Sequence, residues 1–196
     1  MDRVELSRKF WEAQYESESQ GWDLGEVSKP LKNYFDQIKD KSIKILIPGA
    51  GNSYEAEYLS DLGFKEIYVL DWSRKALNNL KKRASQKAHI HYVNDDFFNH
   101  QSKYDLIVEQ TFFCAIDPSL RSQYSEKMAD LLESGGKLVG VLFNFEEERD
   151  HPPYGGNREE YIQYFSPYFK TDIMEAAYNS HAGREGIELF IKLVRK

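Results

Sequence analysis

The stretch from Ile43 to Asp71 constrains the fold of this chain more than any other. An apolar run ends in the turn Gly49-Ala50-Gly51, and a second apolar run ends in Asp71, twenty positions after Gly51. Glycines in such a turn let a ligand approach the backbone, and an acid at the tip of the second strand can accept hydrogen bonds from ribose hydroxyls. The stretch therefore predicts the nucleotide-binding half of an α/β fold and a cofactor that carries a nucleoside.

Strand and helix patterns alternate along the rest of the chain. The apolar runs predict strands at residues 43–47, 67–70, 89–93, 104–108, 137–143, 171–178 and 187–194. Helices are predicted at residues 4–18, 53–62, 73–83, 118–133 and 157–165, and one more begins at residues 28–30. Such alternation predicts a mostly parallel sheet covered by helices on both faces. Residues 179–186 are too few for a crossover helix, so the last two strands are expected to form an antiparallel hairpin at one edge.

Local signals mark where these helices begin and end. Ser28, Ser53 and Ser73 each precede a predicted helix and are expected to cap its first turn. The pair Gly135-Gly136 is expected to end the helix predicted at residues 118–133, since glycine adopts the left-handed conformation that follows many helices.

Composition and charge exclude several classes of function. The chain has 196 residues, a net charge of −6 and a pI near 5.5, so a single domain is expected and the basic surface of a nucleic-acid-binding protein is not. No apolar run approaches the roughly 20 residues of a membrane span, and the first residues lack the apolar segment of a signal peptide. We therefore expect one cytoplasmic domain over residues 1–196, monomeric by default, without a nucleic-acid or membrane partner.

The glycine turn departs from the dinucleotide fingerprint. That fingerprint has a third glycine three residues after the second, where the helix packs closely against the strand, and here Tyr54 occupies the position. The turn is therefore a poor cradle for a diphosphate but remains suitable for a cofactor without phosphate. An NAD-dependent oxidoreductase stays open as an alternative.

Two acidic positions follow neighbouring strands. Asp71 either binds ribose or caps the next helix, and because Ser73 can serve as the cap, Asp71 is expected to be free for a bidentate ribose contact. The run from Asp95 to Phe98 either holds an adenine, through Asp96 and stacked rings, or is a solvated turn with two core phenylalanines. All these positions lie at carboxyl ends of strands, where open α/β sheets bind their ligands.

The fourth predicted strand is followed by further candidate residues. Glu109 is either a structural hydrogen-bond acceptor or a site carboxylate. Cys114, the only cysteine, has apolar neighbours and no basic partner nearby, so a buried structural thiol is expected. His89 and His91 share a strand face, but no second group of ligands accompanies them and no metal site is predicted.

Taken together, these residues resemble the thiopurine S-methyltransferase family of class I S-adenosylmethionine (SAM) methyltransferases, nearest to its thiol/halide methyltransferase branch. The resemblance extends from about residue 10 to residue 169. It is carried by the aromatic spacing of Trp11, Tyr15 and Trp22, by the runs at 46–51, 69–73 and 95–98, by the most specific run Phe112-Phe113-Cys114-Ala115-Ile116-Asp117-Pro118, and by His151-Pro152-Pro153-Tyr154.

The resemblance implies a Rossmann-like class I methyltransferase fold: a seven-stranded, mostly parallel sheet with an antiparallel last strand and helices on both faces. Residues 1–40 are then expected to form a helical lid over the cofactor. The cofactor-binding residues it implies are Trp11, Tyr15, Trp22, Gly49, Gly51, Asp71, Trp72, Asp96, Phe97 and Gln110. Gln110 departs from the tyrosine or arginine that is common in the family at that position.

The function implied is transfer of a methyl group from SAM to a small nucleophilic acceptor, a thiol, a halide or a similar soft anion, by in-line displacement. A thiolate or halide needs no general base, whereas an alcohol or amine needs one, for which Glu109 and His151 are the candidates. A non-catalytic SAM-binding protein is the other alternative.

Overall fold

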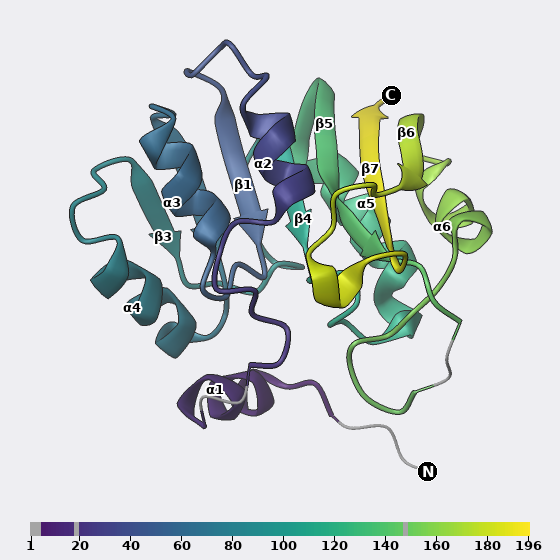
Figure 1. The fold of residues 1–196 in the computed structure, drawn as a ribbon, viewed down its shortest axis with the longest axis horizontal. Helices are drawn as coiled ribbons and strands as arrows, with labels where there is room; N and C mark the ends of the chain where they lie inside the picture. Colours follow the sequence, from purple (N-terminus) through teal and green to yellow (C-terminus); the bar gives the residue numbers. More distant parts are fainter. Residues whose placement is uncertain (1–4, 18–19, 147–148) are drawn as a thin grey trace.

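The computed structural model describes residues 5–17, 20–146 and 149–196, and within these ranges seven strands form one sheet in the order β3-β2-β1-β4-β5-β7-β6 (Figure 1). The strands are β1 Lys44–Pro48, β2 Glu66–Leu70, β3 Ile90–Val93, β4 Tyr104–Gln110, β5 Leu132–Phe143, β6 Phe169–Ala176 and β7 Glu188–Arg195. The helices are α1 Arg8–Glu16, α2 Lys29–Phe35, α3 Tyr54–Asp61, α4 Arg74–Arg83, α5 Arg121–Leu131 and α6 Arg158–Phe165, with short 3-10 turns η1 Pro118–Leu120 and η2 Ala182–Arg184.

The sheet is mostly parallel, and its last strand is antiparallel. The pairs β1–β2, β1–β4, β2–β3 and β4–β5 are parallel. Strand β7 lies between β5 and β6 and is antiparallel to both. The predicted seven-stranded sheet and its terminal hairpin are therefore confirmed, and the carboxyl ends of five successive strands, β1 to β5, meet at one edge.

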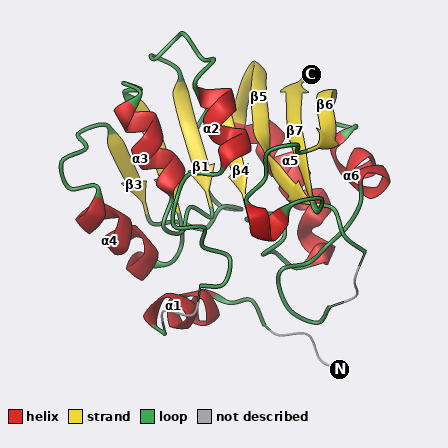
Figure 2. Cartoon of the chain, viewed as in Figure 1, coloured by secondary structure: helices red, strands yellow, loops and turns green. Residues whose placement is uncertain are grey.

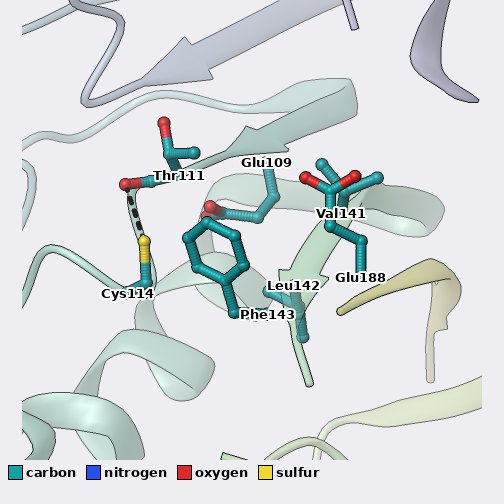
Figure 3. Close-up of a pocket in the computed structure, with 7 residues that line it drawn as sticks. All are labelled: Glu109, Thr111, Cys114, Val141, Leu142, Phe143 and Glu188. Carbon is teal, nitrogen blue, oxygen red and sulfur yellow. Dashed lines mark hydrogen bonds between the residues drawn. The ribbon is translucent and has the colours of Figure 1, made fainter. Parts of the chain in front are cut away.

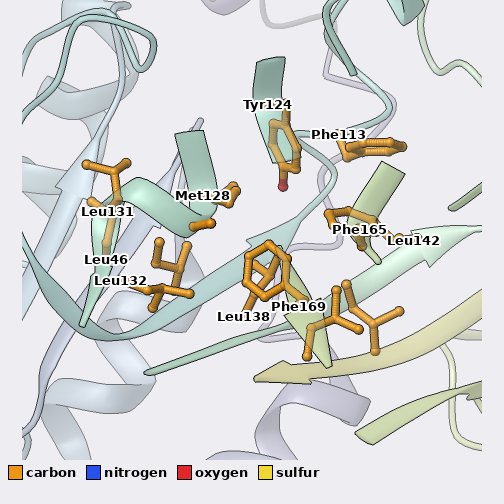
Figure 4. Close-up of a cluster of buried hydrophobic side chains, with 14 of the residues drawn as sticks. Leu46, Phe113, Tyr124, Met128, Leu131, Leu132, Leu138, Leu142, Phe165 and Phe169 are labelled. Carbon is orange, nitrogen blue, oxygen red and sulfur yellow. The ribbon is translucent and has the colours of Figure 1, made fainter. Parts of the chain in front are cut away.

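Alternating side chains on the strands build two cores, one on each face. Ile45 and Ile47 of β1 belong to the core under α2, α3 and α4, whereas Leu46 between them belongs to the core under α5 and α6. Figure 2 shows the first group of helices in front of the sheet, and Figure 4 shows Tyr124 of α5 and Phe165 of α6 in the second core. Helices thus cover both faces, as predicted.

Of the three predicted serine caps, one is confirmed and two are wrong. The Ser73 hydroxyl accepts a hydrogen bond from the Ala76 N–H at 3.1 Å. Ser53 has φ 45, outside the extended conformation that a capping serine needs, and its buried Oγ has no hydrogen-bond partner among the described residues. Ser28 also makes no side-chain cap; instead its backbone N–H donates to Glu55 Oε1 at 3.1 Å.

The predicted helix at residues 118–133 is shorter than expected, because β5 begins at Leu132, directly after α5. Gly135 and Gly136 therefore do not end the helix. Gly135, with φ 74, lies where the β4–β5 register shifts from Tyr104–Leu132 to Leu106–Lys137. Pairing with β4 thus takes these residues into the sheet, which the local glycine signal did not indicate.

The segment predicted as a lid separates into two parts. Helix α2 packs into the sheet core through Leu31 and Phe35, which are both 0% exposed. Helix α1 instead lies at the bottom of Figure 1, near the carboxyl ends of the strands, and packs against α4. It is shorter than the predicted helix, whose ends Val4 and Glu18 lie outside the described residues. None of the described helices has the length and apolar character needed to cross a membrane.

Candidate functional site

A large cleft of about 1270 Å³ opens at the carboxyl ends of the strands. Its walls come from the turns after β1, β2, the short β3 and β4, from α1 and the segment after it, and from the loops around residues 143–153 and 183–187. Small-molecule sites usually measure about 300–1,000 Å³. The cleft therefore has room for a cofactor and a second small molecule side by side.

The glycine turn after β1 forms part of this cleft, and its geometry requires both glycines. Gly49 and Gly51 have φ 56 and 53, in the left-handed region. A Cβ on Gly49 would lie 2.5 Å from Cγ of Phe112, and a Cβ on Gly51 would lie 2.5 Å from the hydroxyl oxygen of Tyr15. Gly49 lines the cleft, whereas Gly51 lies behind it, with its N–H bound to Asp71.

Asp71 lines the cleft at the end of β2 and is only 6% exposed. Its Oδ2 accepts the Gly51 N–H at 2.9 Å and its Oδ1 accepts the Ser73 N–H at 2.7 Å. Ser73 caps α4, as expected, so Asp71 is not needed as the cap, but its carboxylate already accepts these two backbone hydrogen bonds. Burial, partly offset by these two hydrogen bonds, raises the pKa of Asp71 to about 6. Each oxygen keeps a second lone pair, so the carboxylate still has capacity for hydroxyl donors.

The turn after β3 supplies an acid and a buried ring to the same cleft. Asp96 Oδ1 accepts the Phe98 N–H at 2.9 Å. The Phe97 ring is 4% exposed and meets the Phe112 ring edge to face at a centroid distance of 5.1 Å. Phe112, which also covers Gly49, thus connects the glycine turn to the proposed adenine side.

Three aromatic residues close the cleft from the side of α1. The rings of Trp11 and Tyr15 lie 5.7 and 5.9 Å from the Trp22 ring, both edge to face. Burial raises the pKa of Tyr15, so its hydroxyl stays neutral. Arg8 links α1 to the turn after β2 by donating a hydrogen bond to the Trp72 carbonyl at 2.7 Å. Trp11, Tyr15, Trp22 and Trp72 all line the cleft, as the sequence led us to expect.

Glu109 and Gln110 do not line this cleft. Glu109 is 0% exposed and its Oε1 accepts the N–H groups of Phe112 and Phe113 at 2.8 and 3.0 Å, while its Oε2 accepts the Tyr124 hydroxyl. Burial raises the pKa of Glu109 to about 7. Gln110 has a buried Oε1 without a hydrogen-bond partner among the described residues. The geometry of Glu109 is that of a structural acceptor beneath the site.

A second cavity beside Glu109 measures only about 10 Å³, too small for a ligand (Figure 3). Cys114 lies at its wall and donates to the Thr111 carbonyl at 3.3 Å. Burial raises the pKa of this thiol to about 12, which agrees with the expected structural role, because a thiol with so high a pKa is a poor nucleophile.

Another part of the cleft lining, from residues 143–153 and 183–187, combines aromatic rings with cationic groups. Phe143 and Phe145, 5.4 Å apart between centroids, line it together with Ile187. The guanidinium of Arg149 lies over the Phe145 ring at 5.0 Å, and that of Arg184 lies over the Phe143 ring at 5.4 Å. His151 also lines this part but is exposed, and its Nδ1 lies 2.8 Å from the carbonyl of the adjacent Pro152.

Sequence reasoning missed several residues of this cleft. Phe112 belongs to the run that carried the family resemblance most specifically, so that run contained a usable signal. Phe143 and Arg184 offered none, because one ends a strand that reads as core and the other lies in the hairpin between β6 and β7. Only the fold brings them to the same opening as Gly49.

The side chains of the cleft suit the cofactor that the resemblance implies. A buried carboxylate with spare lone pairs, Asp71, suits ribose hydroxyls, and Asp96 beside Phe97 suits an aminopurine. The aromatic faces of Trp11, Tyr15 and Trp22 suit a sulfonium, which aromatic rings attract by the cation–π effect. The residues present therefore fit SAM.

Comparison with known proteins gives the same result. Over residues 6–189 the sequence matches the family described as Thiopurine S-methyltransferase (TPMT). It is 29% identical over 168 residues to "Probable thiol methyltransferase 2" of Arabidopsis thaliana, and the aligned region covers 83% of this chain and 74% of that protein. It is 28% identical over 186 residues to "Thiocyanate methyltransferase 1" of Brassica oleracea, and the aligned region covers 91% of this chain and 81% of that protein.

A solved structure shares the fold. The 1,6-didemethyltoxoflavin-N1-methyltransferase of Burkholderia thailandensis, which holds S-adenosylhomocysteine, superposes with a TM-score of 0.81 at 12% identity and covers 97% of this chain and 88% of that chain. The predicted class I fold is thus confirmed, and the NAD-dependent alternative is set aside by the family match. The chain belongs to the thiopurine S-methyltransferase family and is a SAM-dependent methyltransferase.

Proposed function

We propose that this enzyme methylates a small thiol by in-line displacement, with halides and similar soft anions as further acceptors. The observation that carries the proposal is the part of the cleft lining where the guanidinium groups of Arg149 and Arg184 lie over the rings of Phe145 and Phe143. Arg184 is also paired with Glu188 at 3.3 Å. Bound SAM supplies a methyl group activated by its sulfonium. The relatives named for thiol and thiocyanate methylation support the same class of acceptor.

We propose that the chain's own residues divide the binding of SAM as follows. Asp71 accepts from the ribose, and Asp96 and Phe97 hold the adenine. Gly49 lets the methionine part pass close to the backbone. Trp11, Tyr15, Trp22 and Trp72 cover the cofactor and exclude water, while Gly51 acts through its bond to Asp71. Gln110 lies outside the cleft lining, and its assignment rests on sequence resemblance alone.

Cationic side chains favour a thiolate acceptor. A free thiol has a pKa of about 8.5, and contact with an arginine lowers that pKa, although the charge of Arg184 is already shared with Glu188 at 3.3 Å. A thiolate needs no general base. This suits a site in which Glu109 is fully bonded below the cleft and His151 is exposed at its rim. The main tasks left to the protein are alignment of the reactants and exclusion of water.

An acceptor screen with controlled pH tests the proposal. After binding of S-adenosylhomocysteine is established by calorimetry, turnover is measured with aromatic and aliphatic thiols, iodide, thiocyanate, an alcohol and an amine. We expect thiols to turn over, with kcat/KM rising with pH in step with the pKa of each thiol. If the pH dependence of kcat/KM shows the same pKa for every acceptor, the titrating group belongs to the protein and the enzyme uses a base. Turnover of alcohols and amines alone would lead to the same conclusion.

The predictions of a cytoplasmic location, a monomeric state and no nucleic-acid partner belong to the same proposal. They rest on the acidic composition of the sequence, with its net charge of −6. Light scattering coupled to size exclusion tests the oligomeric state, and a mass twice that of the 23.0 kDa chain would contradict it.

A further inference from the structure

Asp23, in the segment between α1 and α2, makes a polar contact with the glycine turn of the sheet. Its Oδ2 accepts hydrogen bonds from the Asn52 side-chain amide and from the Tyr54 hydroxyl, the latter at 3.4 Å. Its Oδ1 accepts the Gly25 N–H at 2.7 Å, which closes a local turn. Both carboxylate oxygens are therefore used, one within the segment and one toward the turn after β1.

Helix α3, which begins at Tyr54, binds the segment at a second point. Glu55, one residue after Tyr54, accepts the Ser28 N–H at 3.1 Å and is only 5% exposed. From the opposite side, Arg184 donates to the carbonyl oxygen of Trp22. The segment from Trp22 to Ser28 is thus bonded at both of its ends, and α1 precedes it in the chain.

The residues that bond to Asp23, Asn52 and Tyr54, are also contacted by Arg83 at the end of α4. Arg83 donates to the Asn52 carbonyl, and its guanidinium lies over the Tyr54 ring at 4.4 Å. Tyr54 occupies the position at which a dinucleotide fingerprint has its third glycine. Its ring and hydroxyl therefore have a place in this fold: they join Arg83 on one side to Asp23 on the other.

Asp23 is separated from the cofactor region by Trp22. Among the described residues, Asp23, Asn52 and Tyr54 are absent from the lining of the cleft. Trp22, the neighbour of Asp23, lines the cleft and packs against Trp11 and Tyr15. Asp23 can therefore act on cofactor binding through the position of the Trp22 ring and through Asn52, which directly follows Gly51 in the glycine turn.

We propose that Asp23 is a positioning residue for the cofactor: its bonds to Asn52 and Tyr54 couple the aromatic cover to the glycine turn. When these bonds are intact, Trp22 is held where it closes the cleft and supports Trp11 and Tyr15. When they are lost, the cover loosens, although every residue of the cleft lining is unchanged. The inference concerns cofactor binding and does not depend on the identity of the acceptor.

A reciprocal exchange of the two side chains tests this proposal. In Asp23→Asn the new amide cannot accept from both Gly25 and Asn52, and in Asn52→Asp two carboxylates face each other. The double variant, which combines Asp23→Asn with Asn52→Asp, restores the pair with donor and acceptor reversed. Its amide oxygen at position 23 still accepts from Gly25, while its NH2 donates to the acid at position 52. Gln20, whose Oε1 accepts from the Asn52 amide at 3.3 Å in the natural protein, can turn its own amide to donate to the same acid. Asp172→Asn, at an exposed acid that pairs with Lys192, is the matched control.

Two measurements are made on each purified variant: the affinity for S-adenosylhomocysteine by calorimetry, and amide hydrogen exchange of α1 and of residues 20–25 without ligand. We expect each single variant to bind about tenfold more weakly, and the double variant to return to within about threefold of the natural protein. Exchange without ligand should be faster in the single variants and normal in the double variant. Asp172→Asn should change neither measurement.

Two outcomes would overturn the proposal. Asp23→Asn binding S-adenosylhomocysteine as tightly as Asp172→Asn would show that the contact does not position the cover. A double variant as weak as the weaker single variant would show that the two residues do not act as a pair. If Asp23→Asn does not fold, Asn52→Ala decides: it removes the amide that donates to Asp23 and to Gln20, and unchanged affinity and exchange would contradict the coupling.

Discussion

Replacement of Glu109 by glutamine should remove a pH-dependent part of the stability of this protein. The burial of Glu109 raises its pKa from 4.5 to about 7. The folded chain therefore binds this proton more tightly than the unfolded chain does. The resulting stabilisation is complete below pH 4.5 and is lost as pH rises through about 7. At about 1.4 kcal/mol per pH unit, it amounts to about 3 kcal/mol.

The glutamine variant should fold, because the amide can occupy the same hydrogen bonds. Its oxygen can accept the N–H groups of Phe112 and Phe113, and its NH2 can donate to the Tyr124 oxygen, which then acts as acceptor. Glutamine does not ionise, so the contribution from position 109 becomes independent of pH. Asp71 also has a raised pKa, near 6, but it is present in both proteins and its contribution cancels in the comparison.

Urea unfolding of both proteins at pH 5 and pH 8, followed by circular dichroism, tests this reasoning. The natural protein should lose about 3 kcal/mol more than Glu109→Gln between the two pH values. Parallel losses would refute the assignment of a buried, pH-sensitive carboxyl at this position. If Glu109 were instead the general base, Glu109→Gln would abolish turnover while leaving S-adenosylhomocysteine binding intact, and turnover with a thiol distinguishes the two roles.

Three further substitutions test the site and its support. Asp71→Ala should weaken S-adenosylhomocysteine binding at least about tenfold, since it removes a buried acceptor, and normal affinity by calorimetry would contradict the ribose assignment. Cys114→Ser should retain turnover, because the thiol is buried with a pKa of about 12, and loss of turnover in a folded variant would contradict its structural role. Gly140→Ala should destabilise the fold by about 1–3 kcal/mol, because the new Cβ would lie 2.5 Å from the Glu109 carbonyl oxygen, and an unchanged thermal midpoint would contradict this packing.

Features that depend on neighbours in sequence could be predicted without the structure. The alternation of Ile45, Leu46 and Ile47 between two cores follows from the two-residue period of a strand. The glycine turn and Asp71 were recognisable because a strand, a turn and an acid follow one another within thirty residues. The prediction that Ser73 caps a helix from its place in the sequence was correct, because its backbone is extended, as a capping serine requires.

Features that depend on partners distant in sequence could not be predicted. Ser53 resembles Ser73 as a cap signal, but the left-handed backbone of the glycine turn prevents it from capping. The sequence left two roles open for Glu109, and Tyr124 on α5 provides the contact that favours the structural one. Arg184 meets Trp22 across 162 positions of the chain.

The sequence by itself therefore determined the layered α/β architecture, the family and the cofactor, because these depend on local periodicity and on motifs that are continuous along the chain. The tertiary structure decided which described residues before β1 line the cleft, which carboxylates are already bonded, and which cations lie in the cleft lining. The physical reason is that hydrogen bonding, burial and pKa depend on groups brought together in space. Asp23 and Asn52 illustrate this, since nothing in the sequence pairs them and only folding makes them partners.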